Sequence, residues 1–344
     1  MAEVQEVVKF QSENSVDIVG VLESIEITQT RNDGKILETK DGIPFKTARV
    51  RVRVAEGETH QIDMMAMKYY KSKPDEESGQ WKAFNTYEKE FVSIRESEDK
   101  NSEKFGQTPT VVSVGAQFEL NVFKNKAGVL QETTRLRGRF MGREFEKTEE
   151  EYGAFFTIDA AVLANPIPEV VREEETGRLH LKLGLVDYQN KMQPFTFVAE
   201  DVVDEEGNVV EDVTGYLEEN LERGQTMLFS GKVINRYLVK QVERPGEGFG
   251  KKIVDTVRDR VNELKIEGGQ VPRVADDFDE ETDRDKVLFP DQWIEAEDNW
   301  KKHVADIEST STKPAAKNAP AAKQGFGKPA TARKTATLES DLPF

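Results

Sequence analysis

The sequence predicts a mainly β protein, built from two similar small barrels with short helices and followed by a disordered C-terminal tail. Short runs of alternating apolar and polar residues, rich in Val, Ile, Phe and Thr, are bounded by Gly, Asn and Asp, as in half-buried strands between turns. These runs occur in two sets of the same order. From Ser309 on, large apolar residues almost disappear, and such a segment cannot bury enough surface to offset its ordering entropy.

The predicted strands form two sets of five. The first set is 16–30, 46–55, 59–67, 116–124 and 133–141, and the second is 154–164, 178–186, 193–200, 226–237 and 260–267. A helix-like segment follows the third strand of each set, at 81–97 and at 213–223. Three strands, a helix and two strands is the order of the OB-fold, a five-stranded Greek-key barrel that binds oligonucleotides. The sequence therefore predicts two tandem OB-fold-like barrels, with two unrelated small β-domains as the alternative.

Segments outside these strands complete the predicted organisation. Residues 245–250 are expected to form a loop that leads into an amphipathic helix, whose apolar face would carry Ile253, Val254, Val257, Val261 and Leu264. The acidic run 276–281 is expected to mark the exit from the folded body. Pro290 can open a further helix with Trp293, Trp300, Val304 and Ile307 on one side. The predicted divisions are 1–147 and 148–275 for the two barrels, 276–308 for the acidic segment and helix, and 309–344 for the tail.

The net charge of −17 is unevenly distributed along the chain. Residues 1–147 carry 23 Lys and Arg against 25 Asp and Glu, residues 148–312 carry 19 against 38, and residues 313–344 carry 6 against 2. The acidic excess therefore lies in the second half. An almost balanced first domain can still bind phosphate if its cations gather on one face.

Two arginine ladders predict such a face. Arg49, Arg51 and Arg53 alternate with valines, which on a strand places the three guanidiniums on the face opposite the core. Arg135, Arg137 and Arg139 repeat the pattern. A stripe of cations can follow a single-stranded phosphate backbone. The alternative is that Glu56, Glu58 and Glu119 pair with these arginines on an ordinary solvated surface.

Selectivity for single strands also requires exposed aromatic rings on which bases stack. The candidates lie after the third strand, where aromatic residues are interleaved with lysines. They are Lys68, Tyr69, Tyr70, Trp81 and Phe84. This region must also supply the helix that closes the barrel, so each ring has a competing structural interpretation. The first domain is expected to be the main DNA contact.

Motifs for catalysis, metals and cofactors are incomplete or absent. Cys is absent, which excludes disulfides and thiolate zinc sites. The Gly-rich stretch 246–251 lacks the spacing and the hydroxyl of a phosphate-binding loop. The acidic run from Asp277 has Thr282 and Leu288 where a calcium loop requires Gly and Glu. The sequence therefore predicts a non-enzymatic protein without a cofactor or a metal.

Membrane and export signals are also missing from the sequence. No stretch approaches the roughly 20 apolar residues of a membrane span. The first residues lack the pattern of a signal peptide. We therefore expect a cytoplasmic protein with no membrane partner.

The last six residues carry a family resemblance. Glu339, Ser340, Asp341, Leu342, Pro343 and Phe344 resemble the acidic, Pro-Phe-ended tip of bacterial single-stranded DNA-binding proteins and the Phe-ended tails of their phage counterparts. The tandem barrels look more like phage or replication-protein-A-type architectures than like the one-barrel bacterial form. The tip departs from the family in having only two acids, and the linker before it is basic.

The resemblance implies that the chain protects single-stranded DNA and recruits replication, recombination or repair proteins through its tip, in the cytoplasm of the host bacterium if a phage encodes it. A terminal Phe offers a ring and a carboxylate that one basic pocket can capture together. In the partner-docking role, Glu339 and Asp341 would direct the tip toward a basic surface of the partner, and Leu342, Pro343 and Phe344 would bind in its pocket. The alternative is a replisome scaffold or assembly protein whose barrels bind protein. Two barrels in one chain favour a monomer or a small oligomer.

Overall fold

The computed structural model describes residues 9–31, 33–70, 72–204, 206–244 and 253–309. These residues are mainly β, with fifteen strands and four α-helices. The described residues form one compact unit. The predicted disordered linker and docking tip lie outside the described residues, which end at Ser309. No helix in the described part of the chain combines the length and apolar character that a membrane crossing requires.

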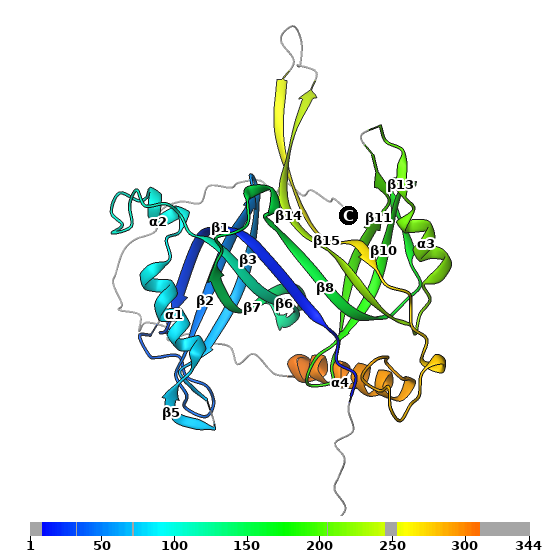
Figure 1. The fold of residues 1–344 in the computed structure, drawn as a ribbon, viewed down its shortest axis with the longest axis horizontal. Coiled ribbons are helices and arrows are strands. Elements are labelled where there is room, and N and C mark those ends of the chain that lie inside the picture. Colours follow the sequence, from blue (N-terminus) through cyan, green and yellow to red (C-terminus); the bar gives the residue numbers. More distant parts are fainter. Residues whose placement is uncertain (1–8, 32, 71, 205, 245–252, 310–344) are drawn as a thin grey trace, which may run out of the picture. The chain divides into compact units, whose positions relative to one another are not determined.

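Eleven strands form one mixed sheet, in the order β2-β3-β7-β6-β1-β8-β14-β15-β11-β10-β9 (Figure 1). The strands of its first half are β1 (Asn14–Thr28), β2 (Phe45–Ala55), β3 (Glu58–Met67), β6 (Val111–Lys124) and β7 (Leu130–Arg143). Those of its second half are β8 (Gly153–Val162), β9 (Ile167–Val171), β10 (Glu174–Val186), β11 (Met192–Glu200), β14 (Thr226–Arg244) and β15 (Ile253–Gly269). The prediction of a mainly β protein is confirmed, although the strands belong to one large sheet and not to two separate ones.

Additional pairings close each half into a cycle. In the first ring, β1 pairs with β2, β2 with β3, β3 in parallel with β7, β7 with β6, and β6 again with β1. In the second ring, β8, β10, β11, β15 and β14 pair in the same succession, with β11 and β15 parallel. Residues 14–19 of β1 also pair with residues 153–158 of β8, and this contact makes the two rings one continuous sheet.

Helices follow the third strand of each ring, as the sequence predicts. They are α1 (Gly79–Glu90) and α2 (Ile94–Glu98) in the first ring and α3 (Val213–Asn220) in the second. The Ser78 side chain caps α1 by accepting a hydrogen bond from the Trp81 amide. Small hairpins complete this region: β4 (Tyr69–Tyr70) pairs with β5 (Lys73–Glu77), and β12 (Val202–Val203) pairs with β13 (Val209–Glu211).

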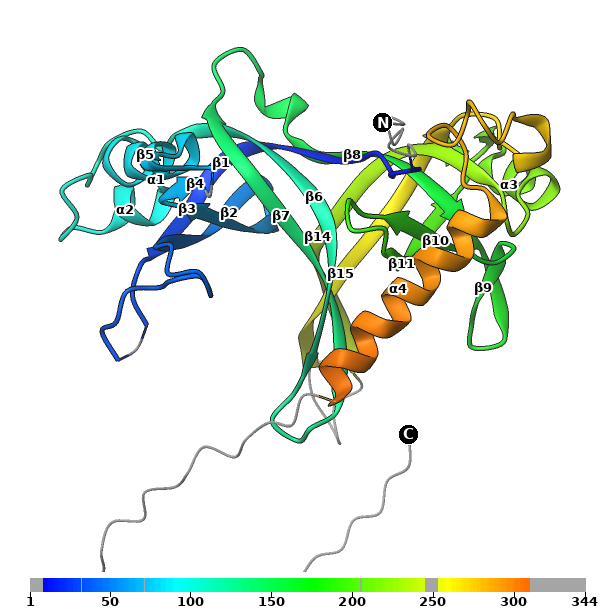
Figure 2. The same ribbon diagram turned by 90° about the horizontal axis from the view of Figure 1, so that it is seen from below.

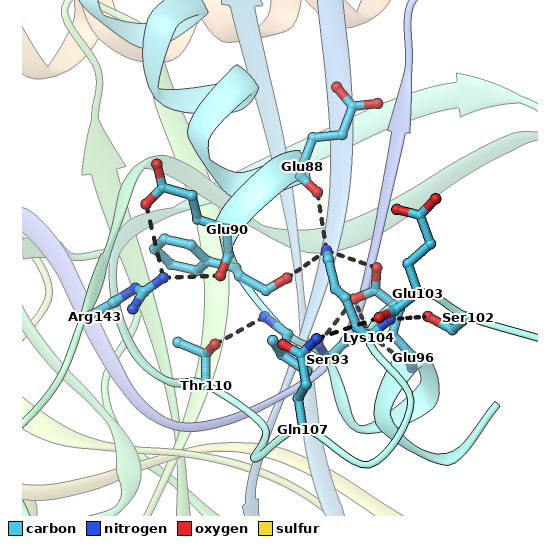
Figure 3. Close-up of polar contacts among 12 residues, drawn as sticks. Glu88, Glu90, Ser93, Glu96, Ser102, Glu103, Lys104, Gln107, Thr110 and Arg143 are labelled. Carbon is cyan, nitrogen blue, oxygen red and sulfur yellow. Dashed lines mark hydrogen bonds and ion pairs between the residues drawn. The ribbon is translucent and has the colours of Figure 1, made fainter. Parts of the chain in front are cut away.

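Lys104 fixes the corner between α1 and α2 (Figure 3). Its ammonium donates to the carbonyl oxygens of Glu88 at 3.0 Å and Phe91 at 2.7 Å, and to Glu96 Oε1 at 2.9 Å. It thereby supplies the carbonyls at the end of α1 with a cationic partner. Arg143, which follows the second arginine ladder, donates to the Glu90 carbonyl at 2.9 Å. Arg143 therefore holds this corner in place.

Two sequence predictions in the second half are wrong. Residues 253–264 form part of β15 and not a helix, because β14 offers an antiparallel partner along the whole segment. Three of the five apolar residues expected on the helix face are valines, and branched side chains pack well on a pleated strand. The acidic run 276–281 does not end the folded body either, since Val287, Leu288 and Phe289 are buried beyond it.

The predicted helix after the acidic run is present as α4 (Pro290–Ser309). Trp300 is buried in the main core, and Val304 and Ile307 pack against that core. The helix contacts β11 of the second ring and β6 of the first (Figure 2). It therefore spans both rings and helps to fix their relative placement.

Candidate nucleic-acid interface

The first arginine ladder lies on the outer face of β2. Val50 and Val52 are completely buried, whereas Arg49 and Arg53 are exposed and Arg51 is half-buried. The alternation has the expected cause, since successive side chains of a strand point to opposite faces. The core of the first ring therefore holds the valines and leaves the guanidiniums outside.

Strand β3 offers these arginines few carboxylates. The residues across from Arg51 and Arg53 are Gln61 and Thr59, both neutral, and only Arg49 faces an acid. The Arg49 Nε lies 3.8 Å from Asp63 Oδ1, a long contact. Within the described residues, no carboxylate lies within ion-pair distance of Arg51 or Arg53. Their charge is therefore available to an anionic ligand.

The second ladder on β7 adjoins this face because β3 and β7 pair in parallel, with Asp63 beside Arg137. Arg137 pairs with Glu119 at 3.4 Å, and Arg139 donates to Gln117 Oε1 at 3.3 Å. Arg135 is exposed and has no ion pair among the described residues. Glu119 therefore neutralises one rung of the second ladder. We call the outer surface of β2, β3 and β7 with its six arginines the arginine face.

Glu58 does not neutralise the ladder, because it joins the two rings. It accepts a hydrogen bond from the Asn235 amide at 3.2 Å, and its Oε1 lies 3.4 Å from Nε2 of the buried His60. The imidazole of His60 and the amide of Asn235 hold the pKa of Glu58 below its ordinary value. The Asn235 side chain also donates to the Thr59 carbonyl at 2.7 Å.

The β14–β15 hairpin forms a wall beside the arginine face. Cross-strand pairing places Tyr237 beside Arg260, and Asn235 beside Asn262, on one face of the hairpin. The Tyr237 amide donates to the Gly57 carbonyl at 3.2 Å, which attaches the hairpin to the turn between β2 and β3. The hairpin projects from the second ring in yellow-green and yellow in Figure 1.

Two adjoining cavities lie between the arginine face and this hairpin. The larger, of about 700 Å³, is lined by Arg49 and Arg135, and the smaller, of about 530 Å³, by Arg51, Arg53 and Tyr237. Gln61, Asn235 and Arg260 line both. We call the combined cavity the inter-ring groove. It brings five arginines together with an aromatic ring, that of Tyr237, which is 56% exposed.

Two of the aromatic residues that were expected to stack on bases are buried. Trp81 is only 5% exposed and Phe84 is fully buried. Both lie with Tyr87 on the buried side of α1, and Phe84 and Tyr87 belong to the main core. Lys46 Nζ covers the Trp81 ring at 4.7 Å from its centroid, and Lys68 Nζ lies at 6.0 Å. No base can reach either ring face in this arrangement.

Lys68, Tyr69 and Tyr70 lie away from the Tyr237 end of the groove. The hairpin that contains the tyrosines follows Met67, which pairs with the first residue of β2, whereas Arg53 is near the end of β2. Eight residues of strand separate these ends by about 26 Å. Tyr69 is half-buried and Tyr70 is 44% exposed. The structure therefore does not bring these residues together with Arg53 and Tyr237.

In the equivalent ladder of the second ring, Arg178 and His180 lie close to glutamates, whereas Lys182 is exposed without an ion pair among the described residues. Arg178, His180 and Lys182 alternate on β10 with buried leucines. Arg178 is within ion-pair distance of Glu169 at 3.4 Å, Glu200 at 3.2 Å and Glu263 at 2.6 Å. These carboxylates come from β9, β11 and β15. The outer face of the second ring consequently offers an anion much less positive charge than the arginine face.

The hairpin wall is not among the sites that the sequence predicts. Asn235 and Tyr237 lie in the predicted strand 226–237, and Arg260 and Asn262 lie in the predicted strand 260–267. Their period-2 spacing on two predicted strands was the available signal. Their position beside β2 depends on contacts between residues about 180 apart, such as Glu58 with Asn235, which periodicity does not reveal.

The described geometry defines a mainly β protein with a cationic groove between two rings of strands, and within the described residues no cluster of His, Asp and Glu could hold a metal ion. The chain belongs to the YorF family, whose model matches residues 12–290. Among solved structures it is similar to a deletion mutant of the single-stranded DNA-binding protein from Thermus aquaticus, with 11% identity and a TM-score of 0.43, over 79% of this chain and 98% of that one. No curated protein matches the chain.

Proposed function

We propose that the protein binds single-stranded DNA in the inter-ring groove and protects it during replication, recombination or repair, without catalysis and without a cofactor. The observation that carries the proposal is the set of arginines lacking an ion pair among the described residues, Arg51, Arg53 and Arg135, around one groove. Guanidiniums left without carboxylates attract phosphates and release the counterions of the nucleic acid.

The ring topology supports this ligand. We interpret each ring as an OB-fold barrel, since its strands close in the order one, two, three, five, four. OB-folds bind oligonucleotides on the face of strands two and three and with the loops after strands one and four. In the first ring those two strands are β2 and β3, which carry Arg49, Arg51 and Arg53. The functional division at residue 147, with the first barrel as the main contact, is part of this proposal.

Tyr237 supports a preference for single strands. A base of a duplex is already stacked within the helix, whereas an unpaired base can stack on an exposed ring. Arg260 lies beside Tyr237 on the same face of the hairpin, so a phosphate and its base can be bound together. The second ring thus contributes its hairpin, while Arg178 of its own ladder remains paired with glutamates.

The test compares oligo-dT with a duplex of equal length by fluorescence anisotropy across a salt series. We expect tighter binding of oligo-dT and an affinity that falls linearly on a logarithmic salt scale. Equal affinity for both DNAs, or no binding at low salt, would disprove the proposed function.

The docking role of residues 339–344 is a separate part of the proposal, and these residues are outside the described part of the chain. Deleting Phe344 should leave oligo-dT affinity unchanged and abolish binding of replication proteins in a pull-down. Unchanged pull-down would refute the role.

A replisome scaffold is the second candidate. The pairing of Arg178 with three glutamates and the 38 acids against 19 bases in residues 148–312 favour it. If the barrels bind protein only, the salt series with oligo-dT will show no binding at any ionic strength.

A further inference from the structure

An apolar pocket of about 280 Å³ lies beside α3 in the second ring. Its floor consists of Leu217, Met227, Phe229 and Ile266, all of them buried, and Tyr216 on its wall is 43% exposed. None of these residues lines the inter-ring groove. The pocket, which we call the α3 pocket, is therefore a feature that DNA binding does not use.

The rim of the α3 pocket is acidic. Glu211, Asp212 and Glu267 line it, and residues 201–222 contain nine Asp and Glu and no Lys or Arg. Asp212 caps α3 by accepting from the Gly215 amide at 2.7 Å, and Glu267 pairs with Lys232 at 3.0 Å. Glu211 has no ion pair among the described residues. This charge repels nucleic acid and anionic lipid and attracts a basic partner.

More apolar surface adjoins this rim. The β12–β13 hairpin, which leads into α3, exposes Val202, Val203, Val209 and Val210 by 41 to 63%. Isolated exposed valines are ordinary on a protein surface, but four of them on one short hairpin beside an apolar pocket are typical of an interaction site.

The backbone of β15 is accessible where it borders the pocket. Strand β11 pairs with β15 only at Lys265 and Ile266. In the described structure Gly268 and Gly269 pair with β14 alone, and Glu267 lies at a β-bulge between them and Ile266. Gly268 and Gly269 line the pocket there, and a strand without side chains allows another backbone to approach closely. An exposed strand edge binds an extended peptide through main-chain hydrogen bonds.

We propose that the α3 pocket docks an extended, basic segment of a partner protein. One apolar side chain of the segment enters the pocket, its Lys or Arg residues face the acidic rim, and its backbone runs along residues 267–269. The site lies on the folded body, so this interaction is independent of both the inter-ring groove and residues 339–344.

The test uses the full chain and a synthetic peptide in which one Phe is flanked on each side by two Lys. Two comparison peptides replace the Phe by Ser or all four Lys by Glu. Isothermal titration should show binding of the first peptide, and at least about tenfold weaker binding of the other two, since each lacks one element of recognition.

Variants locate the site. Tyr216→Ala should weaken binding of the Phe peptide about tenfold. Glu211→Lys should weaken it about fivefold, because it reverses a charge on the rim of the pocket. The matched control is Glu175→Lys, which reverses an exposed acid on the β9–β10 hairpin and should leave binding unchanged. Circular dichroism confirms that each variant is folded.

Three outcomes would overturn the inference: no binding of the Phe peptide, equal binding of the Phe and Ser peptides, or equal loss in the Glu175 control. Oligo-dT affinity of Tyr216→Ala should equal that of the original chain. Failure of peptide docking with intact DNA binding would leave the proposed function standing, so the two ideas are tested separately.

Discussion

Removing the cations of the inter-ring groove should weaken DNA binding by an amount that the structure allows to be calculated. The variant combines Arg51→Ala, Arg53→Ala and Arg260→Ala. All three side chains line the smaller cavity, and the first two have no ion pair among the described residues. Because they lie outside the core, the rings should remain folded without them.

The magnitude follows from counterion release. Each phosphate contact on a single strand contributes about 0.7 to the slope of log affinity against log salt, so losing three contacts lowers the slope by about 2. With a slope of about 2, the three contacts increase the affinity about a hundredfold more at 0.1 M salt than at 1 M salt. The loss should therefore be large at low salt and should shrink as salt rises.

The assay is fluorescence anisotropy with labelled oligo-dT between about 0.05 and 0.5 M NaCl, because a roughly tenfold change in salt is enough to measure the slope of log affinity against log salt. The control removes the same charge elsewhere, with Arg95→Ala, Lys286→Ala and Lys301→Ala. Each of these residues has an acidic partner within 4 Å, and none lines the groove. If the control variant loses as much slope as the groove variant, or if the groove variant loses none, the assignment of the phosphate path is wrong.

Four further predictions follow. Tyr237→Ala should weaken oligo-dT binding about tenfold, because stacking on an aromatic ring is worth about 1–3 kcal/mol per base. The dependence of affinity on salt should not change, and Tyr237→Phe, which keeps the ring, should bind normally; fluorescence anisotropy measures the affinity of both variants. Trp81→Ala should lower the free energy of unfolding by about 3 kcal/mol in urea melts, with unchanged affinity of the folded protein. Lys104→Met should lower that free energy by roughly 1–3 kcal/mol, because carbonyls of α1 lose their donor. The pKa of Glu58 is lowered in the folded protein, so its contribution to stability is present above the pKa of the unfolded state and is lost as the pH falls through the pKa of the folded state. Glu58→Gln should therefore make the free energy of unfolding depend less on pH between about pH 3 and 7, as measured by urea melts.

The strand pattern of the sequence predicted the arginine face well. Alternation with a period of two decides which side chains face a core, and Arg49, Arg51 and Arg53 followed that rule. The interleaving of aromatic residues with lysines did not identify exposed rings at Trp81 and Phe84, because these two residues, three apart, lie on the buried side of α1. A local pattern therefore located the cations but could not assign the aromatic contacts.

The second wall of the groove could not be predicted from local patterns. Its position depends on the register between β14 and β15 and on the attachment of Asn235 and Tyr237 to the turn at Gly57. The apolar residues of 253–264 were compatible with a helix as well as with a strand. Only the long antiparallel partner β14 decides between them, and it is a tertiary contact.

The two rings show how one strand pattern can have opposite electrostatic outcomes. Strand β2 presents Arg51 beside neutral Gln61, whereas β10 presents Arg178 between three glutamates. The alternation on the strand itself is the same, so the difference lies in the neighbouring strands. Net charge cannot distinguish these cases, because it counts paired and unpaired arginines alike. A chain with a charge of −17 can therefore hold a groove with five arginines, because Arg51, Arg53 and Arg135 have no ion pair among the described residues, whereas Arg178 has three.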